Sequence, residues 1–213
     1  MKREEQKEIR EMKKLLPVEI RKQRKLFNFQ YAYGFLYRFE GDFLYQAIVD
    51  VSSSQVDVIK FATLIKPWIL NETYWEIQQM DMEEMRSKPK SLHVNGAFTI
   101  NDIYFDSSSL AYDKNDFGNS IHEVLCRFDA EISNHKKRLT SISELIKGIE
   151  GYKVSNLTKA IGLIYEGDYE KARDMLLLPE SEGDVYKHTI LRNGKGISAR
   201  DLALDYCQRK LSN

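Results

Sequence analysis

The chain has few cysteines, prolines and glycines for its length, and it lacks any long hydrophobic run. Its 213 residues contain two cysteines, four prolines and eleven glycines. Two cysteines, Cys126 and Cys207, are too few for a disulfide framework, so we expect both to be buried apolar residues in a reducing compartment. No apolar run reaches the ~20 residues of a membrane span, and the first residues are too highly charged for a secretory signal. We therefore expect a cytoplasmic protein with no membrane partner.

Net charge is also absent, because 32 basic residues balance 32 acidic ones. Such a chain has no global field that attracts nucleic acid, so we do not expect nucleic acid as a partner. The charge is uneven, however. Residues 1–25 contain ten Lys or Arg and five Glu, which leaves a net charge of −5 on the rest of the chain. The alternative is RNA binding through this basic N-terminal helix and the aromatic residues that follow it. Its interleaved glutamates instead favour i,i+4 ion pairs in solvent.

The N-terminal 25 residues have the spacing of an amphipathic helix. Apolar residues recur at steps of three and four, and charged residues occupy the other positions. The apolar residues on or near one face are Ile9, Met12, Leu15, Leu16 and Ile20. Pro17 lacks a backbone N–H and its ring clashes with the preceding turn, so we expect a kink or two short helices there.

A period of two then replaces the helical period. Alternating residues predict a strand over 31–39 and a second over 43–51, and the turn Glu40-Gly41-Asp42 joins them into a hairpin. A third strand is predicted near 56–65. A fourth is predicted over 97–105, after the turn signal Asn95-Gly96 and before a serine-rich loop.

The second half of the chain has helical periodicity. A long helix is predicted over 120–147, with a capping box formed by Ser120 and Glu123 and a stop at Gly148. A helical hairpin over 155–178 and a last helix from Ser198 follow. Because strands and helices occupy separate blocks, we predict an α+β fold. It comprises an N-terminal helix, an antiparallel β-sheet of about four strands packed on a long helix, and an all-helical C-terminal segment. The predicted domains are 1–150, the α+β domain, and 151–213, a helical C-terminal extension.

Candidate catalytic and metal sites each lack a required partner. His122 and Cys126 are spaced i,i+4 on one helix face, as two metal ligands can be, but no further ligand lies nearby in the sequence. Asp50, Asp57 and Lys60 come near a nuclease metal site. Two residues separate Asp57 from Lys60, however, which places their side chains on opposite faces of a strand. We therefore predict no catalytic residue, no metal site and no cofactor.

A pocket between the sheet and the long helix is a second hypothesis, and it would serve a small-ligand-binding protein or an enzyme. Aromatic and polar side chains would line it. They are Tyr31, Tyr33, Arg38, Tyr45, Trp68, Trp75, His93 and His122. The competing interpretation is that the rings form the hydrophobic core, where large aromatic side chains bury most area.

A further pattern extends over about residues 10–150. Its parts are Leu15-Leu16, the segment 35–42 (FLYRFEGD), the strands up to Ile65, Trp75 and the helix after 120. Together they resemble an uncharacterised bacterial family, a domain of unknown function with members similar to the immunity proteins of toxin systems. The resemblance implies an α+β fold and binding of a protein without chemistry, and it carries over no functional residue. With the acidic body and the helical hairpin, it favours a non-catalytic protein-binding module with an unidentified protein partner.

Overall fold

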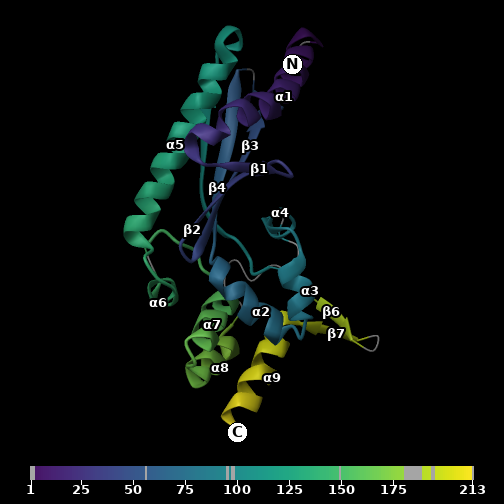
Figure 1. Cartoon of the computed structure of the whole chain (residues 1–213), viewed down its shortest axis with the longest axis vertical. Coiled ribbons are helices and arrows are strands. Elements are labelled where there is room, and N and C mark those ends of the chain that lie inside the picture. The colour runs from purple at the N-terminus through teal and green to yellow at the C-terminus, as the bar shows by residue number, and fades with distance from the viewer. Residues whose placement is uncertain are drawn as a thin grey trace. The chain divides into compact units, whose positions relative to one another are not determined.

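The computed structural model in Figure 1 has the predicted α+β architecture, with an N-terminal helix, an antiparallel sheet on a long helix, and further helices. It describes residues 3–55, 57–94, 96, 99–148, 150–179, 189–192 and 195–212. The chain forms two compact units. The first unit contains residues 1–65 and 104–138, and the second contains residues 66–103 and 139–213. The chain thus leaves the sheet after its fourth strand and returns to it for the fifth.

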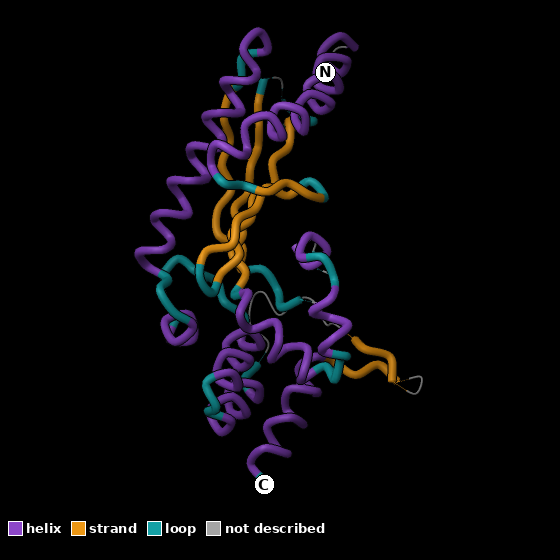
Figure 2. Tube along the Cα trace, viewed as in Figure 1, coloured by secondary structure: helices purple, strands orange, loops and turns teal. Residues whose placement is uncertain are grey.

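The first unit consists of one sheet and the helices that pack on it (Figure 2). Its elements are α1 (Arg3–Gln23), η1 (Arg24–Phe27), β1 (Gln30–Ala32), β2 (Phe35–Glu40), β3 (Phe43–Val51), β4 (Val58–Lys66), β5 (Ile103–Ala111), η3 (Lys114–Asp116) and α5 (Phe117–Arg138). The five strands are antiparallel, and their order in space is their order in the sequence. The end residues of β4 and β5, Lys66 and Ile103, already belong to the second unit.

The strand predicted over 31–39 is in fact a small hairpin, β1 and β2. Its turn consists of Tyr33 and Gly34, whose φ angles are 52° and 84°. Two successive positive φ angles are typical of the type I′ turns that match the twist of a hairpin. A two-residue turn leaves the alternation of side chains almost undisturbed, which is why the sequence pattern concealed it. The predicted turn between β2 and β3 is confirmed, since Glu40 pairs with Phe43.

The core of the first unit lies between the sheet and its helices. Helix α5 buries Ile121, Leu125, Phe128 and Ile132 completely. Burial of each such side chain contributes roughly 1.5–3 kcal/mol. Helix α1 buries the stripe Ile9, Met12, Leu16 and Ile20. It also runs through Pro17 as one helix. Of the two alternatives expected there, a kink or two short helices, the second was wrong. Because Leu16 and Ile20 are buried on either side of the proline, tertiary packing stabilises the helix through it.

Several predicted boundaries of the central segment were wrong. Helix α5 begins at Phe117, so Ser120 lies inside it and accepts a hydrogen bond from the Asp113 backbone N–H instead of forming a capping box (3.2 Å). The predicted helix over 120–147 is divided, because Ser141 caps a new helix by accepting a bond from the Glu144 backbone N–H (3.3 Å). Cys126 is exposed, contrary to expectation, whereas Cys207 is buried.

The second unit is mainly helical. Its elements are η2 (Trp68–Leu70), α2 (Asn71–Ile77), α3 (Met82–Ser87), α4 (Lys90–Val94), α6 (Ile142–Lys147), α7 (Asn156–Tyr165), α8 (Tyr169–Leu177), β6 (Thr189–Arg192), β7 (Lys195–Ser198) and α9 (Ala199–Leu211). The hairpin β6–β7 corrects the expectation that the C-terminal segment is wholly helical. Residues 97 and 98 of the strand predicted over 97–105 lie outside the described residues. Over the rest of that range the strand begins at Ile103, and it takes in the serines that were assigned to a loop.

The helical hairpin predicted over 155–178 is confirmed as α7 and α8. Gly167 makes the turn with a φ of 84°, and the Asp168 carboxylate accepts a bond from the Lys171 backbone N–H (3.2 Å). Gly162 lets α6 approach α7, because a Cβ atom there would lie 2.9 Å from Cγ1 of Ile146. The domain boundary predicted near residue 150 concerns independent folding and stays a prediction. Within the described residues, no helix is long and apolar enough to cross a membrane.

Candidate functional site

The outward face of α1 combines exposed apolar side chains with lysines. Its members lie on α1 and on η1, which continues it, and we call this set the α1 surface. They are Lys14, Leu15, Val18, Lys22, Lys25 and Leu26. Steps of three, four and seven residues place them within one arc of a helix, opposite the buried stripe. Leu15 was expected on the buried side, but it is 41% exposed, Val18 is 43% exposed and Leu26 is 74% exposed.

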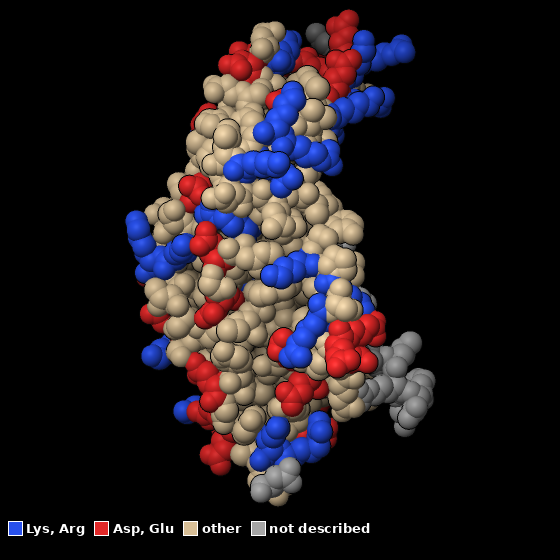
Figure 3. All heavy atoms as spheres, viewed as in Figure 1, with Lys and Arg blue, Asp and Glu red and all other residues tan. Residues whose placement is uncertain are grey.

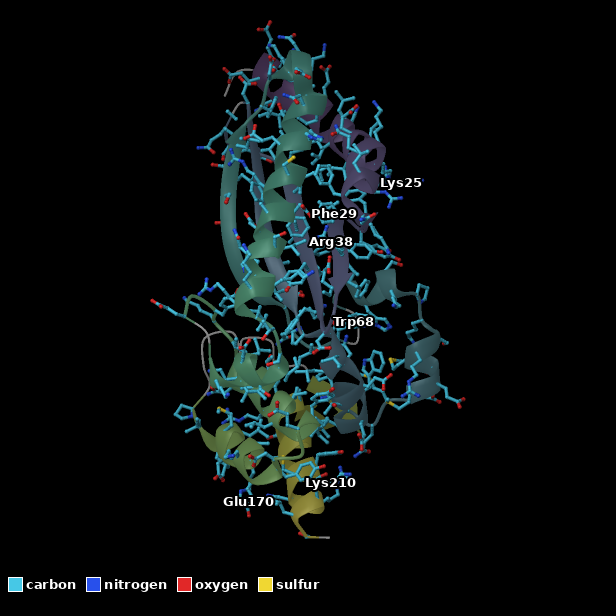
Figure 4. The ribbon with its side chains drawn as sticks, turned by 60° about the vertical axis from the view of Figure 1, so that its left-hand side comes forward. Lys25, Phe29, Arg38, Trp68, Glu170 and Lys210 are labelled. Atoms are coloured by element: carbon cyan, nitrogen blue, oxygen red, sulfur yellow. The ribbon has the colours of Figure 1, made fainter. Side chains whose placement is uncertain are left out.

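The lysines make the α1 surface positive. Lys22 pairs with Glu19 at 2.6 Å, but Lys14 and Lys25 make no ion pair with any residue that the structure describes. Figure 3 shows Lys and Arg side chains gathered over this helix, and Figure 4 shows Lys25 pointing away from it. Apolar side chains that are exposed together and rimmed by charged groups are typical of an interaction surface.

Polar contacts fix the middle and the C-terminal end of α1 on the body of the first unit. In the middle of the helix, Lys13 donates to Asp50 at 3.1 Å and to Ser53 at 2.8 Å. At the C-terminal end, the Gln23 side-chain amide donates to the Gly118 carbonyl at 2.7 Å. The Gln23 carbonyl oxygen accepts from Nδ1 of His122 at 3.1 Å. The α1 surface is therefore presented on a rigid helix, which lowers the entropy cost of binding.

Arg38 holds the segment that follows α1 (Figure 4). Its Nη1 donates to the Phe27 carbonyl at 2.9 Å and to Asp129 at 2.7 Å. Its Nε lies 2.9 Å from a Glu40 carboxylate oxygen, and its guanidinium lies 4.9 Å from the centre of the Phe29 ring. Arg38 thus joins η1, β2 and α5, and its role in the structure is to position η1 against the sheet.

The β1–β2 hairpin lies beside the C-terminal part of α1. The Arg21 guanidinium sits 5.4 Å from the centre of the Tyr31 ring, a cation–π contact. Tyr33, at the tip of the hairpin, is 61% exposed. An exposed aromatic ring next to a basic helix adds one more group that a partner could contact.

The second unit contains an open hollow of about 730 Å³. It is lined by Trp68, Ile69, Asn71, Glu72, Thr73, Trp75, Glu76, Met82, Met85, Arg86, Lys88, Lys90, His93 and Tyr165. The His93 ring contacts both indoles, and its centre lies 5.8 Å from that of Trp68 and 5.4 Å from that of Trp75. Its Nε2 lies 3.2 Å from the Met85 carbonyl oxygen. Because a carbonyl oxygen only accepts hydrogen bonds, this contact assigns a proton to Nε2.

A fully buried lysine, Lys66, lies next to His93. Its ammonium donates to the His93 carbonyl at 3.2 Å and to the Thr99 hydroxyl at 2.8 Å, and it lies 3.4 Å from Asp102. Burial lowers the pKa of Lys66 below its usual 10.5, because the cost of desolvating the charge exceeds the attraction of Asp102.

The lowered pKa of Lys66 has a consequence for stability. The unfolded chain binds this proton more tightly, so the free energy of unfolding rises with pH from the folded-state pKa up to about 10.5. Below the folded-state pKa, Lys66 is protonated in both the folded and the unfolded chain, and its contribution to the free energy of unfolding is constant. We expect Lys66→Met to lack this rise when the free energy of unfolding is measured with urea from neutral to alkaline pH. The other titrating groups contribute equally to the wild type and the variant, so parallel curves of unfolding free energy against pH would contradict the lowered pKa of Lys66.

The eight residues of the predicted pocket are distributed over both units. Trp68, Trp75 and His93 come together in the hollow of the second unit. The other five are Tyr31, Tyr33, Arg38, Tyr45 and His122, and they lie in the first unit. There Tyr45 is completely buried in the core, beside the ring of His135 at 6.4 Å.

The residues that sequence reasoning missed are the outward-facing Val18 and Leu26. A strict helical projection of α1 could have found Val18, since it lies opposite Ile9 and Ile20. Leu26 lies beyond α1, in η1, so this projection does not extend to it. Among the residues that the structure describes, no three His, Cys, Asp or Glu side chains are grouped so that they could hold a metal ion. Comparison of the chain with protein-family models, with curated proteins and with solved structures finds no match.

Proposed function

We propose that this protein is a non-catalytic protein-binding module, and that an acidic surface of another protein docks on the α1 surface. One observation carries the proposal. Val18 and Leu26 are exposed on a rigid helix among lysines, two of which have no ion pair within the described residues. Apolar anchors ringed by charge are the usual anatomy of a protein interface, in which the apolar centre supplies most of the affinity.

The same surface is less suited to RNA. Leucine and valine side chains cannot stack on bases as aromatic rings do. Among the aromatic residues of the β1–β2 hairpin and η1 that the structure describes, Tyr33 is the one with a largely exposed ring. The resemblance to immunity-protein-like domains supports the protein-binding role, since such proteins act by contact with a protein partner.

Site-directed photo-crosslinking tests the proposal. The photoreactive amino acid benzoylphenylalanine is placed at position 26, or at position 177 as a matched control. Both positions hold leucines, which are 74% and 66% exposed. In nuclease-treated lysate of cells that encode the protein, we expect position 26 to give a covalent adduct with an acidic protein. Position 177 should give none. The yield should fall as salt is raised, because surface charges are screened within about 8 Å at physiological ionic strength.

Three outcomes would contradict this function. Equal adducts at positions 26 and 177 would mean non-specific capture. An adduct that nuclease removes would mean nucleic acid instead of protein. An adduct with a second copy of the chain would mean self-association through the α1 surface.

A further inference from the structure

We propose that Tyr33, at the tip of the β1–β2 hairpin, is an aromatic anchor that enters an apolar pocket of the same protein partner. This role rests on the proposed function and extends the interface beyond the α1 surface, to which Tyr33 does not belong. Three observations carry it. They are the backbone conformation of Tyr33, the exposure of its ring and the position of the hairpin next to α1.

The backbone of Tyr33 lies in the left-handed region, with a φ of 52°. The residue occupies the first central position of a turn with two positive φ angles, where Asn, Asp and Gly are preferred because a bulky side chain crowds the backbone there. Among the described residues, the other non-glycine residues with a positive φ are Asn28, Asp57 and Gln79. Asn and Asp tolerate this conformation, so Tyr33 is the bulky aromatic exception in this set.

The ring of Tyr33 contributes little to the packing of the fold. It is 61% exposed, the largest exposed fraction among the aromatic side chains that the structure describes. It makes no hydrogen bond, ring contact or cation–π contact with any described residue. An unfavourable backbone conformation that no packing offsets points to a role in binding, since such strain is concentrated at functional sites.

The hairpin brings Tyr33 close to the α1 surface. Two residues before it, the centre of the Tyr31 ring lies 5.4 Å from the Arg21 guanidinium, so β1 runs beside the C-terminal part of α1 (Figure 1). At about 3.3 Å per residue, Tyr33 lies at most about 7 Å further along the chain. An interface of ordinary size buries about 800 Å² of each protein, so one partner can cover both the α1 surface and Tyr33.

A tyrosine ring suits the role of an anchor. It offers a large contact area while few side-chain torsions have to be fixed, and tyrosine is enriched among the residues that dominate binding energy. A ring of this size is stabilised by transfer from water into an apolar pocket. We therefore expect the ring to carry the contact, so that Tyr33→Phe binds the partner as the wild type does.

Photo-crosslinking in the same nuclease-treated lysate tests this role. Benzoylphenylalanine at position 33 retains an aromatic ring and should form an adduct with the acidic protein that position 26 captures. The control is position 165, where Tyr165 on α7 is 46% exposed, and it should give no adduct. With the crosslinker at position 26, Tyr33→Asn should lower the adduct yield at least about fivefold, whereas Tyr33→Phe should leave it unchanged.

Urea unfolding separates a role in binding from a role in the fold. Tyr33→Asn should raise the urea midpoint, because asparagine tolerates a positive φ, so this variant loses the partner while it gains stability. Gln79→Asn is the matched control, at a φ of 52° in the second unit. It should also raise the midpoint, but without changing the adduct yield at position 26.

The anchor role is overturned if position 33 gives no adduct or captures a different protein, or if Tyr33→Asn lowers the urea midpoint. It is equally overturned if Tyr33→Asn leaves the yield at position 26 unchanged, or if Tyr33→Phe or Gln79→Asn lowers that yield as much as Tyr33→Asn does. In each of these cases an adduct at position 26 leaves the proposed function standing. Absence of an adduct at position 26 contradicts the proposed function and the anchor role together.

Discussion

Arg38→Ala is expected to lower the free energy of unfolding by about 2–4 kcal/mol. The side chain is only 15% exposed and holds the Phe27 carbonyl, Asp129 and Glu40 at once. Truncation leaves a partly buried carbonyl without its donor and removes the cation that Asp129 and Glu40 share, and both effects are costly. Glu40 keeps its ion pair with Lys136 at 2.8 Å, so the loss of charge pairing falls mainly on Asp129. The packing of the guanidinium on Phe29 is also lost. Urea unfolding followed by far-ultraviolet circular dichroism measures the change.

An exposed arginine on α5 serves as the control. Among the residues that the structure describes, Arg127 pairs only with Glu123, at 2.6 Å and one turn away on the same helix. Arg127→Ala should therefore change the free energy of unfolding by no more than about 0.5 kcal/mol. Arg38→Lys should fall between the two, because lysine keeps the positive charge but lacks the planar guanidinium whose Nη1 and Nε face different acceptors and which packs on the Phe29 ring. If Arg38→Ala cost no more than Arg127→Ala, Arg38 would not hold η1 in place.

Periodicity was sufficient to predict the elements that bury one face. Helix α1, strand β3 and the hairpin of α7 and α8 were predicted to within a few residues, because each alternates apolar and polar residues at its own period. The fold class followed from the grouping of these elements, strands first and helices after.

Turns and helix caps set the element boundaries that periodicity did not predict. Tyr33-Gly34 reverses the chain without interrupting the alternation, so one apparent strand is two. Ser141 restarts a helix where the apolar spacing continues unbroken from α5 into α6. In each case the backbone changes direction while the spacing of apolar residues continues unchanged. The spacing alone therefore does not reveal the turn.

The sequence did not predict which elements come together in the tertiary structure. Residues 66–103 are inserted between two neighbouring strands, so Trp68, Trp75 and His93 belong to a different unit from Tyr45 and Arg38. No local signal marks this, because strand neighbours are set by long-range packing. The outward exposure of Leu26 was equally hidden, since an apolar residue is as compatible with a core as with an interface.

Val18→Asp combined with Leu26→Asp is expected to weaken binding of the protein partner at least about 100-fold. Each substitution removes an apolar anchor, and central anchors are worth about 2 kcal/mol or more. Each also places a carboxylate opposite an acidic partner, which repels it. Because both side chains are exposed, the fold should be little affected, and the free energy of unfolding should change by no more than about 1 kcal/mol.

Leu177→Asp combined with Leu178→Asp is the matched control. These two leucines are also exposed, at the end of α8 in the second unit, and lie outside the α1 surface. Each double variant therefore replaces two exposed apolar residues with aspartate, one on the α1 surface and the other at the end of α8. A general effect of added negative charge would weaken partner binding by both double variants. A specific site on the α1 surface would weaken binding only by Val18→Asp/Leu26→Asp.

The most direct measurement is calorimetric titration of the crosslinked partner, once purified, into the wild-type protein and the two double variants. Docking on the α1 surface predicts equal affinity for the wild type and for Leu177→Asp/Leu178→Asp, and an affinity at least about 100-fold lower for Val18→Asp/Leu26→Asp. Equal affinity for all three proteins would contradict the proposed function.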